Sequence, residues 1–207
     1  MSTGLRERKK TETFQAINRA ALALATERGP AAITVDDIAE AAGVSARTVF
    51  NYFPTKDAAI LGVDPDLRSR IRDRLRERPT DEEPLVALRA AFRGVSSGRH
   101  APSWRMRARL VSEHAHLQSA AAASTHQLET ELTEVVAERC GLDPFAHPYP
   151  RLVTHLAIAA LRVATDQTLA GPTSPADQPD LDVAVDSAVD EAFDALSGGL
   201  RPPQEHR

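Results

Sequence analysis

The chain has 207 residues, a net charge of −4, an aromatic content of 4% and a single cysteine. This length is sufficient for one or two domains with a substantial core, and the negative charge argues against indiscriminate nucleic-acid binding. The lone Cys140 excludes an intramolecular disulfide, no long apolar run is present, and the first residues are polar and charged. We therefore expect a soluble, cytoplasmic protein without a membrane segment.

The amino-terminal region predicts a helix over residues 11–28, closed by Gly29 and Pro30. Residues 1–8 are expected to form a disordered basic arm before it. Apolar residues recur along the helix at intervals of three and four and predict its buried face. They are Phe14, Ile17, Ala21, Leu24 and Ala25.

Residues 33–62, ITVDDIAEAAGVSARTVFNYFPTKDAAILG, predict two short helices joined by a glycine turn. The hydroxyl of Thr34 is placed to cap the first helix, and Gly43 suits the left-handed position after its end. Ser45 is placed to cap the second helix, and Thr55 starts a third. Two helices joined by a four-residue turn form the geometry that lays the second helix in a DNA major groove.

The second of these helices holds the groups that read DNA in such a motif. Val49, Phe50 and Phe53 are expected to point inward and fix its angle. Arg47 can donate two parallel hydrogen bonds to guanine, and Asn51 can pair with adenine.

The same segment resembles the signature of the TetR family of transcriptional regulators. The matching positions are Thr34, Ile38, Ala39, Ala42, Gly43, Val44, Ser45, Thr48, Phe50, Tyr52, Phe53 and Lys56. Phe50 stands where tyrosine is commoner, a change expected to keep the packing. The resemblance implies an all-α protein of about nine helices, with a three-helix head and a helical-bundle body that binds a ligand and forms homodimers. Together with the helix pattern it gives the candidate DNA-contacting residues: Thr34, Ser45, Ala46, Arg47, Thr48, Asn51, Tyr52, Lys56, Lys9 and Lys10.

The remaining sequence is helical in pattern. The expected helices run over residues 55–78 (bent near Asp64 and Pro65), 84–97, 102–113, 116–140, 151–170 and 181–196, with a proline-rich loop over 171–180 and a disordered tail over 201–207. The expected domains are a DNA-binding head over residues 1–56 and a ligand-binding and dimerisation domain over residues 57–200.

Charge is distributed unevenly along the chain. Residues 1–62 hold eight basic and seven acidic residues, so this part carries +1 and the remainder −5. Lys9, Lys10 and Lys56 all lie in the first part. A modest basic rim on an acidic protein suits a regulator that must find one site on DNA and be released from it.

Two helices near the carboxy terminus predict a dimer interface. The helix over 151–170 has almost no polar face, and the last helix has one apolar stripe, so four such helices from two chains can form a bundle. The alternative is that both helices only complete the core of one chain. The candidate interface residues are Leu156, Ala160, Val163, Val185, Val189 and Phe193.

A ligand pocket is expected among the central helices. The candidate lining residues are Phe92, Trp104, Met106, Arg109, His155 and Arg162. The stretches LRERPTDEEPLVALRAAF and GLDP resemble the regulators related to the mycofactocin-cluster repressor. That resemblance implies an acyl-coenzyme A or another amphipathic ligand.

We expect a sequence-specific repressor that a small molecule releases from a palindromic operator. An activator, or a regulator controlled by a protein partner, has the same head, and an architectural DNA-binding protein is a further alternative. No enzyme is expected, because the sequence contains no G-x-S-x-G motif, no phosphate-cradling glycine loop and no cysteine with an adjacent histidine. No cofactor is expected, and no metal site is expected because His114 and His116 would point about 200° apart on a helix. The arginine run from Arg68 to Arg78 is expected to be a solvated face. Within it, Arg72, Arg74 and Arg76 can pair locally with Asp73, Glu77 or the acidic residues at 81–83.

Overall fold

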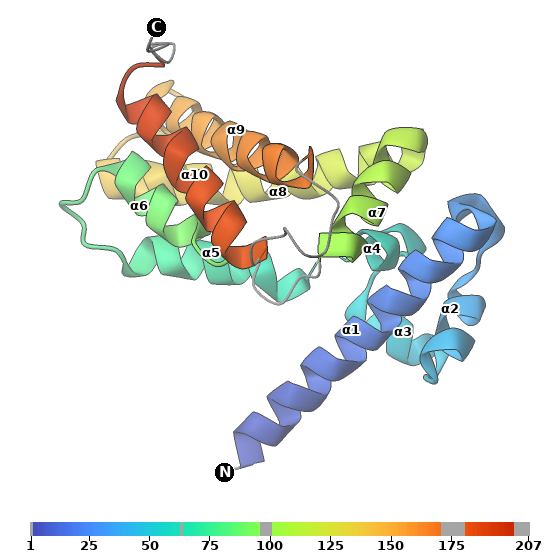
Figure 1. Ribbon diagram of the computed structural model, residues 1–207. Coiled ribbons are helices and arrows are strands. Elements are labelled where there is room, and N and C mark those ends of the chain that lie inside the picture. The colour runs from blue at the N-terminus through green and yellow to red at the C-terminus, as the bar shows by residue number, and fades with distance from the viewer. Residues whose placement is uncertain (1, 63, 96–100, 171–180, 201–207) are drawn as a thin grey trace, which may run out of the picture. The chain divides into compact units, whose positions relative to one another are not determined.

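The computed structural model describes residues 2–62, 64–95, 101–170 and 181–200. The described residues form helices joined by turns, without a strand, which confirms the predicted all-α class (Figure 1). The loop predicted over 171–180 and the tail predicted over 201–207 lie outside them. The helices are α1 (Ser2–Arg28), α2 (Val35–Ala42), α3 (Ala46–Tyr52), α4 (Lys56–Leu61), α5 (Pro65–Glu77), α6 (Pro84–Phe92), α7 (Ala101–Glu113), α8 (Ala115–Cys140), α9 (Tyr149–Ala170) and α10 (Leu181–Ser197).

The chain forms two compact units. Unit 1 consists of Met1–Pro65 and Pro102–Thr125, and unit 2 consists of Asp66–Ala101 and His126–Arg207. The helix α8 therefore begins in unit 1 and ends in unit 2. This division differs from the predicted boundary after residue 56, since a segment distant in sequence belongs to the same unit as the amino-terminal helices.

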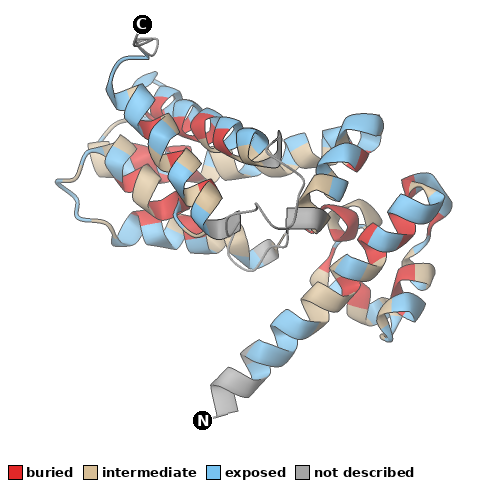
Figure 2. Ribbon diagram, viewed as in Figure 1, coloured by how far each residue is buried: buried red, intermediate tan, exposed pale blue. Residues whose placement is uncertain are grey.

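The hydrophobic core of unit 1 explains that division. Helices α1 to α4 pack around Ile17 and Phe53, and the ring of Phe53 lies 4.8 Å from that of Phe14. Leu110 of α7 and Leu117 of α8 are buried in the same cluster. Figure 2 shows buried residues along the second half of α1, which agrees with the predicted inward face of this helix. The helix-turn-helix is thus completed by side chains that follow it by about fifty residues or more.

The first helix is longer than predicted. α1 begins at Ser2, so the prediction of a disordered arm over residues 1–8 is wrong. Residues 5–10, LRERKK, have high helix propensity and continue the helix beyond the core. An ion pair of 3.4 Å between Arg8 and Glu12, one turn apart, supports it. The basic residues there are consequently presented on a helix.

The helix predicted over residues 55–78 is interrupted. α4 ends at Leu61, and Gly62 takes a left-handed conformation with φ 58° that terminates it. α5 then begins at Pro65. Glycine followed within three residues by proline is a stop signal that the sequence already contained.

In unit 2, α10 packs on α9 and α6. All three helices have buried apolar side chains. Val185, Val189 and Phe193 are fully buried there within the single chain. The ring of Phe193 lies 6.2 Å from that of Phe92 in an edge-to-face arrangement. The apolar stripe of α10 therefore faces inward.

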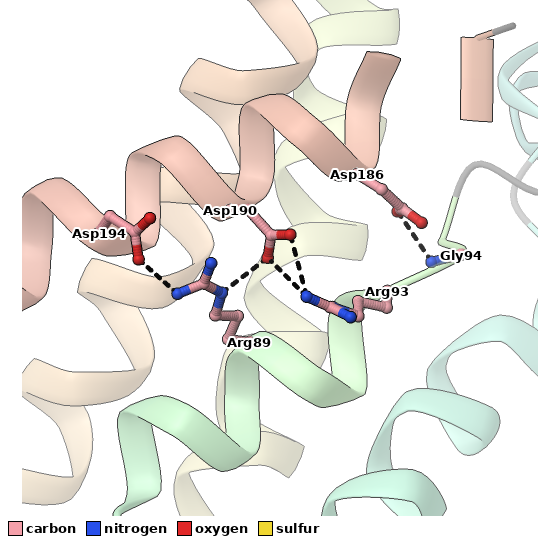
Figure 3. Close-up of polar contacts among 6 residues, drawn as sticks. All are labelled: Arg89, Arg93, Gly94, Asp186, Asp190 and Asp194. Atoms are coloured by element: carbon pink, nitrogen blue, oxygen red, sulfur yellow. Dashed lines mark hydrogen bonds and ion pairs between the residues drawn. The ribbon is translucent and has the colours of Figure 1, made fainter. Parts of the chain in front are cut away.

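Asp186, Asp190 and Asp194 form an acidic face of α10, and this face pairs with arginines at α6 and just after its end (Figure 3). Arg89 donates from Nε to Asp190 at 2.7 Å and from Nη1 to Asp194 at 2.5 Å. Arg93 donates to both carboxylate oxygens of Asp190, at 3.0 and 3.2 Å. The backbone amide of Gly94 donates to a third aspartate of the same face. These contacts hold the two helices in register.

The ion pairs of Asp190 are expected to stabilise unit 2 near neutral pH and to lose this effect in acid. Burial raises the pKa of this carboxyl, but hydrogen bonds from Arg89 and Arg93 outweigh burial and leave the pKa below its ordinary value of 3.8. A lowered pKa stabilises the folded state at pH values above the ordinary pKa, and this stabilisation is lost as the pH falls through the lowered pKa.

We expect Asp190→Asn to lower the free energy of unfolding by about 1 kcal/mol near pH 7 and by less toward pH 3, as measured by denaturant unfolding. Asp166→Asn, an exposed aspartate of α9, is the control; a cost for Asp190→Asn that does not change with pH would contradict the assignment.

The arginine run is paired across helices. Its members between α5 and α8 contact groups that lie about sixty residues away in sequence, so local pairing alone does not describe them. The contacts are Arg68 with Gln127 and Glu131, Arg72 with Glu131 and the adjacent Asp73, Arg76 with Glu138, Arg78 with Glu82, and Arg74 with the carbonyl of Arg93. Arg78 pairs with Glu82, and the pair of Arg72 with Asp73 is one of the local pairs that the sequence predicted.

Candidate nucleic-acid interface

The helix α2 begins with a reciprocal cap. The amide of Asp37 donates to the hydroxyl of Thr34 at 3.1 Å, and the amide of Thr34 donates back to the Asp37 carboxylate at 2.7 Å. Hydrogen bonds from the side chain and backbone of Thr34 lower the pKa of Asp37. Gly43, with φ 67°, closes the helix in the left-handed conformation that the sequence predicted. These caps fix both ends of the helix that precedes α3.

The helix α3 is capped by Ser45, whose hydroxyl accepts from the amide of Thr48 at 3.1 Å. Val49 and Phe53 are buried, as predicted, and anchor the helix on the core of unit 1. Arg47 and Asn51 are exposed on the opposite side. A guanidinium and an amide one turn apart on an anchored helix can both address base edges in a major groove.

Phe50 does not lie where the sequence analysis placed it. Its side chain is 55% exposed, so the prediction that it points inward is wrong. Positions three and four residues apart share a helix face, and Phe50 thereby joins Arg47 and Asn51 on the outer side. An exposed phenyl ring here can contact a thymine methyl. Helix geometry applied to residues 47, 50 and 51 would have found this residue.

Two other candidates lie partly against the core. Ala46 and Tyr52 are half-buried and pack on the core cluster of unit 1. Only part of the surface of each side chain is therefore accessible to DNA that contacts α3. Thr48 is half-buried, and its hydroxyl lies 2.8 Å from that of Ser45.

The lysines lie around this surface in different ways. Lys56 donates from Nζ to the carbonyl of Ile33 at 2.9 Å, which ties the first turn of α4 to the segment before α2. Lys9 and Lys10 are exposed on the first half of α1. Their placement on a helix gives them a fixed spacing along any phosphate backbone that they meet.

The residues predicted to line a ligand pocket are divided between the two units. Trp104, Met106 and Arg109 belong to unit 1, and the last of them is exposed and paired with Glu113 at 2.8 Å. Phe92, His155 and Arg162 belong to unit 2. Phe92 fills the core against α10, and the other two are exposed on α9.

One hollow of about 400 Å³ lies between α1 and α7, wholly within unit 1. Its walls are mainly apolar, and Met106 is the predicted pocket residue that lines it. The lining residues are Arg19, Leu22, Ala23, Thr26, Glu27, Ser103 and Met106.

The predicted dimer residues separate into two groups. Val185, Val189 and Phe193, together with Ala160, are buried within one chain. They complete the core, the alternative that the sequence left open. Leu156 and Val163 remain exposed on α9, at 37% and 50%.

Within the described residues, no group of three His, Cys, Asp or Glu side chains is placed to hold a metal ion, and no helix is long and apolar enough to cross a membrane. The rings of His114 and His116 lie 5.9 Å apart, edge to face. Nδ1 of His114 contacts the carbonyl of Leu110, and Nε2 of His116 lies 3.9 Å from Asp57.

Comparison with known proteins agrees with this geometry. Residues 17–61 match the family described as bacterial regulatory proteins, tetR family, and residues 82–201 match the MftR C-terminal domain. The chain is 29% identical to the HTH-type transcriptional regulator TcmR of Streptomyces glaucescens, over 97% of this chain and 91% of that protein.

Two solved structures have a similar fold. The fatty acid degradation regulator FadR of Bacillus halodurans has a TM-score of 0.52 and 20% identity, over 92% of this chain and 97% of that one. FadR of Thermus thermophilus, a repressor solved in complex with lauroyl-CoA, has a TM-score of 0.50 and 23% identity, over 94% and 98%.

The helix-turn-helix and these matches together define the class of protein as a DNA-binding transcriptional regulator. The chain belongs to the TetR family of bacterial transcriptional regulators, and its carboxy-terminal part is of the MftR type.

Proposed function

We propose that this TetR-family regulator is a repressor that binds an inverted-repeat operator as a dimer and is released by a small amphipathic molecule. The observation that carries the proposal is the division of α3 into two faces. Val49 and Phe53 anchor the helix, while Arg47, Phe50 and Asn51 are exposed together on its other side. This arrangement supports direct readout of bases in the major groove.

A dimer follows from the small size of this surface, because one recognition helix contacts too few bases to specify a unique site. The exposed apolar residues of α9 support a helix-to-helix contact. Leu152, Leu156, Ala159 and Val163 are exposed at intervals of three and four residues, which places them on one stripe. Singly exposed apolar residues are common, but a continuous stripe indicates an interaction surface.

Replacing this stripe with charge is expected to separate the dimer. Leu156→Asp combined with Val163→Asp would bury four unpaired carboxylates in a symmetric interface, each of which costs several kcal/mol. Light scattering at micromolar concentration should then give the mass of one chain, and operator affinity should fall at least about 100-fold. Val86→Asp, on an exposed apolar residue of α6, is the matched control and should leave the mass unchanged. A dimeric double variant would contradict the assignment of the stripe.

The effector that we propose is an acyl-coenzyme A or a molecule of similar amphipathic character. Support comes from the MftR-type carboxy-terminal part and from the fold shared with a repressor solved with lauroyl-CoA. Such a ligand lowers operator occupancy only if it binds the DNA-free conformation more tightly than the DNA-bound one. Lauroyl-CoA is therefore the first probe to add to a preformed complex with DNA.

The function is tested by incubating the purified protein with fragmented genomic DNA of its source at physiological salt and sequencing the retained fragments. Recovery of a few short inverted repeats supports a sequence-specific dimeric regulator. Sequence-independent recovery with a steep salt dependence would instead indicate an architectural protein. Higher transcription beside the repeats in a strain lacking the protein identifies repression, and lower transcription identifies activation.

A further inference from the structure

The carboxy-terminal end of α4 is held by side chains from two other helices of unit 1. Nδ2 of Asn18, on α1, donates to the carbonyl of Ala59 at 2.6 Å and lies 3.5 Å from that of Ile60. Nε of Arg107, on α7, donates to the carbonyl of Ile60 at 3.3 Å. Nη2 of the same guanidinium donates to Oδ1 of Asn18 at 3.0 Å. Together these contacts join α1, α4 and α7.

The chemistry of this set suits the end of a helix. The last carbonyls of α4 form the negative end of its dipole, and that of Ala59 also accepts from the backbone amide of Gly62 at 3.3 Å. A guanidinium and an amide supply donors to them, and hydrogen bonds from a charged donor are stronger than neutral ones. The guanidinium also orients Asn18, since its bond to Oδ1 directs Nδ2 toward α4.

Gly62 leaves the space that these groups occupy. A Cβ at this position would lie 2.7 Å from Nδ2 of Asn18 and 2.9 Å from Nη2 of Arg107. Both distances are shorter than side chains tolerate, so a larger residue would displace the amide, the guanidinium or both. The left-handed backbone at Gly62 adds a second reason for glycine here.

The amino-terminal end of α4 is tied as well. Thr55 caps it, Lys56 donates to the carbonyl of Ile33, and Asp57 lies 3.9 Å from Nε2 of His116 at the start of α8. α4 has only six residues and directly follows α3. With both ends fixed, a movement of α7 must either carry α4 and α3 with it or break the contacts of Arg107.

We propose that Arg107 is a positioning residue that locks α4 to α7 and thereby sets the orientation in which α3 is presented to DNA. This inference rests on the proposed binding of a dimer to an inverted repeat. α7 leads through the turn at His114 into α8, which continues into unit 2. Arg107 thus links α4, and through it α3, to α7, which leads into the helix α8 that continues into unit 2.

The test compares affinities for two operators that differ only in spacing. One base pair inserted at the centre of the recovered repeat moves the half-sites apart by about 3.4 Å and rotates them by roughly 35°. Wild-type protein, with its heads held, should strongly prefer the native spacing. Arg107→Ala should reduce this preference about tenfold, the factor that corresponds to 1.4 kcal/mol and is close to the lower end of the range for hydrogen bonds to a charged group.

Two further variants address the same contacts. Gly62→Ala should reduce the preference for native spacing as Arg107→Ala does, because its Cβ meets the same two side chains. Arg107→Lys keeps a positive charge near the end of α4 but lacks the forked donors, so it should restore part of the preference. Arg76→Ala is the matched control, since it removes an arginine of unit 2 whose ion pair with Glu138 spans 3.7 Å. A general loss of stability would weaken binding to both operators equally and leave their ratio unchanged.

The outcomes separate this inference from the proposed function. The role of Arg107 would be overturned if the folded Gly62→Ala variant and a folded variant of Arg107, either Arg107→Ala or Arg107→Lys, both kept the full wild-type preference for native spacing. The regulator function would then still stand. Should Arg107→Ala fail to give a cooperative unfolding transition, Arg107→Lys decides the question. Wild-type protein that recovers no inverted repeat would overturn the proposed function and this inference together.

Discussion

Arg47→Ala is expected to lower operator affinity by about 1–3 kcal/mol for each half-site and to relax the preference at one base position. Arg47 is exposed on α3, and its helix is anchored by buried Val49 and Phe53, so the guanidinium is presented from a fixed base. Since the arginine contributes nothing to the core, the free energy of unfolding should stay within about 0.5 kcal/mol of the wild-type value.

The measurement is fluorescence anisotropy at one fixed salt concentration, with the recovered operator and all of its single-base variants. Asn51→Ala should relax a second, different position. Lys9→Ala serves as the contrast, because loss of a phosphate contact weakens binding to every variant about equally and reduces the salt dependence. Arg47→Ala protein that ranks all operator variants as the wild type does would show that this arginine reads no base.

Leu117→Ala is expected to destabilise the DNA-binding unit by about 2–5 kcal/mol, the range found when a buried leucine is truncated. Leu117 is fully buried in the same cluster as Ile17 and Phe53, although it lies on α8. Loss of its side chain leaves a cavity in the core on which the helix-turn-helix packs. The short helices α2 and α3 have few other buried side chains to offset this loss of packing.

Denaturant unfolding monitored by circular dichroism measures this cost, and operator affinity should fall alongside it. Val86→Ala removes an exposed apolar side chain of α6 and should change the free energy of unfolding by no more than about 0.5 kcal/mol. A Leu117→Ala cost as small as that of the control would mean that α8 does not support the head.

The local features of the helix-turn-helix were readable from the sequence because they depend on groups a few residues apart. The caps at Thr34, Ser45 and Thr55 each use a hydroxyl that accepts from an amide three residues later. The left-handed turn at Gly43 follows from the residue itself. The inward face of α1 follows from spacing alone. Such interactions need no knowledge of where the rest of the chain lies.

The tertiary structure decided what depends on partners distant in sequence. Arg72 meets Glu131, and Arg107 reaches Asn18 and the end of α4, through contacts that no helical period encodes. As patterns, the helix over 151–170 had almost no polar face and the last helix had one apolar stripe, and both predicted a dimer interface. In the structure the stripe of α10 is buried within the chain, whereas part of the apolar surface of α9 is exposed.

The sequence by itself determined the family, the helical class and the capped helices of the helix-turn-helix, since these depend on short-range caps and periodicity. Only the tertiary structure showed that α7 and α8 complete the DNA-binding unit and that Phe50 lies on its outer face. The physical reason is that burial is a property of an assembled core. Whether an apolar side chain lies inside depends on which other helices arrive to cover it.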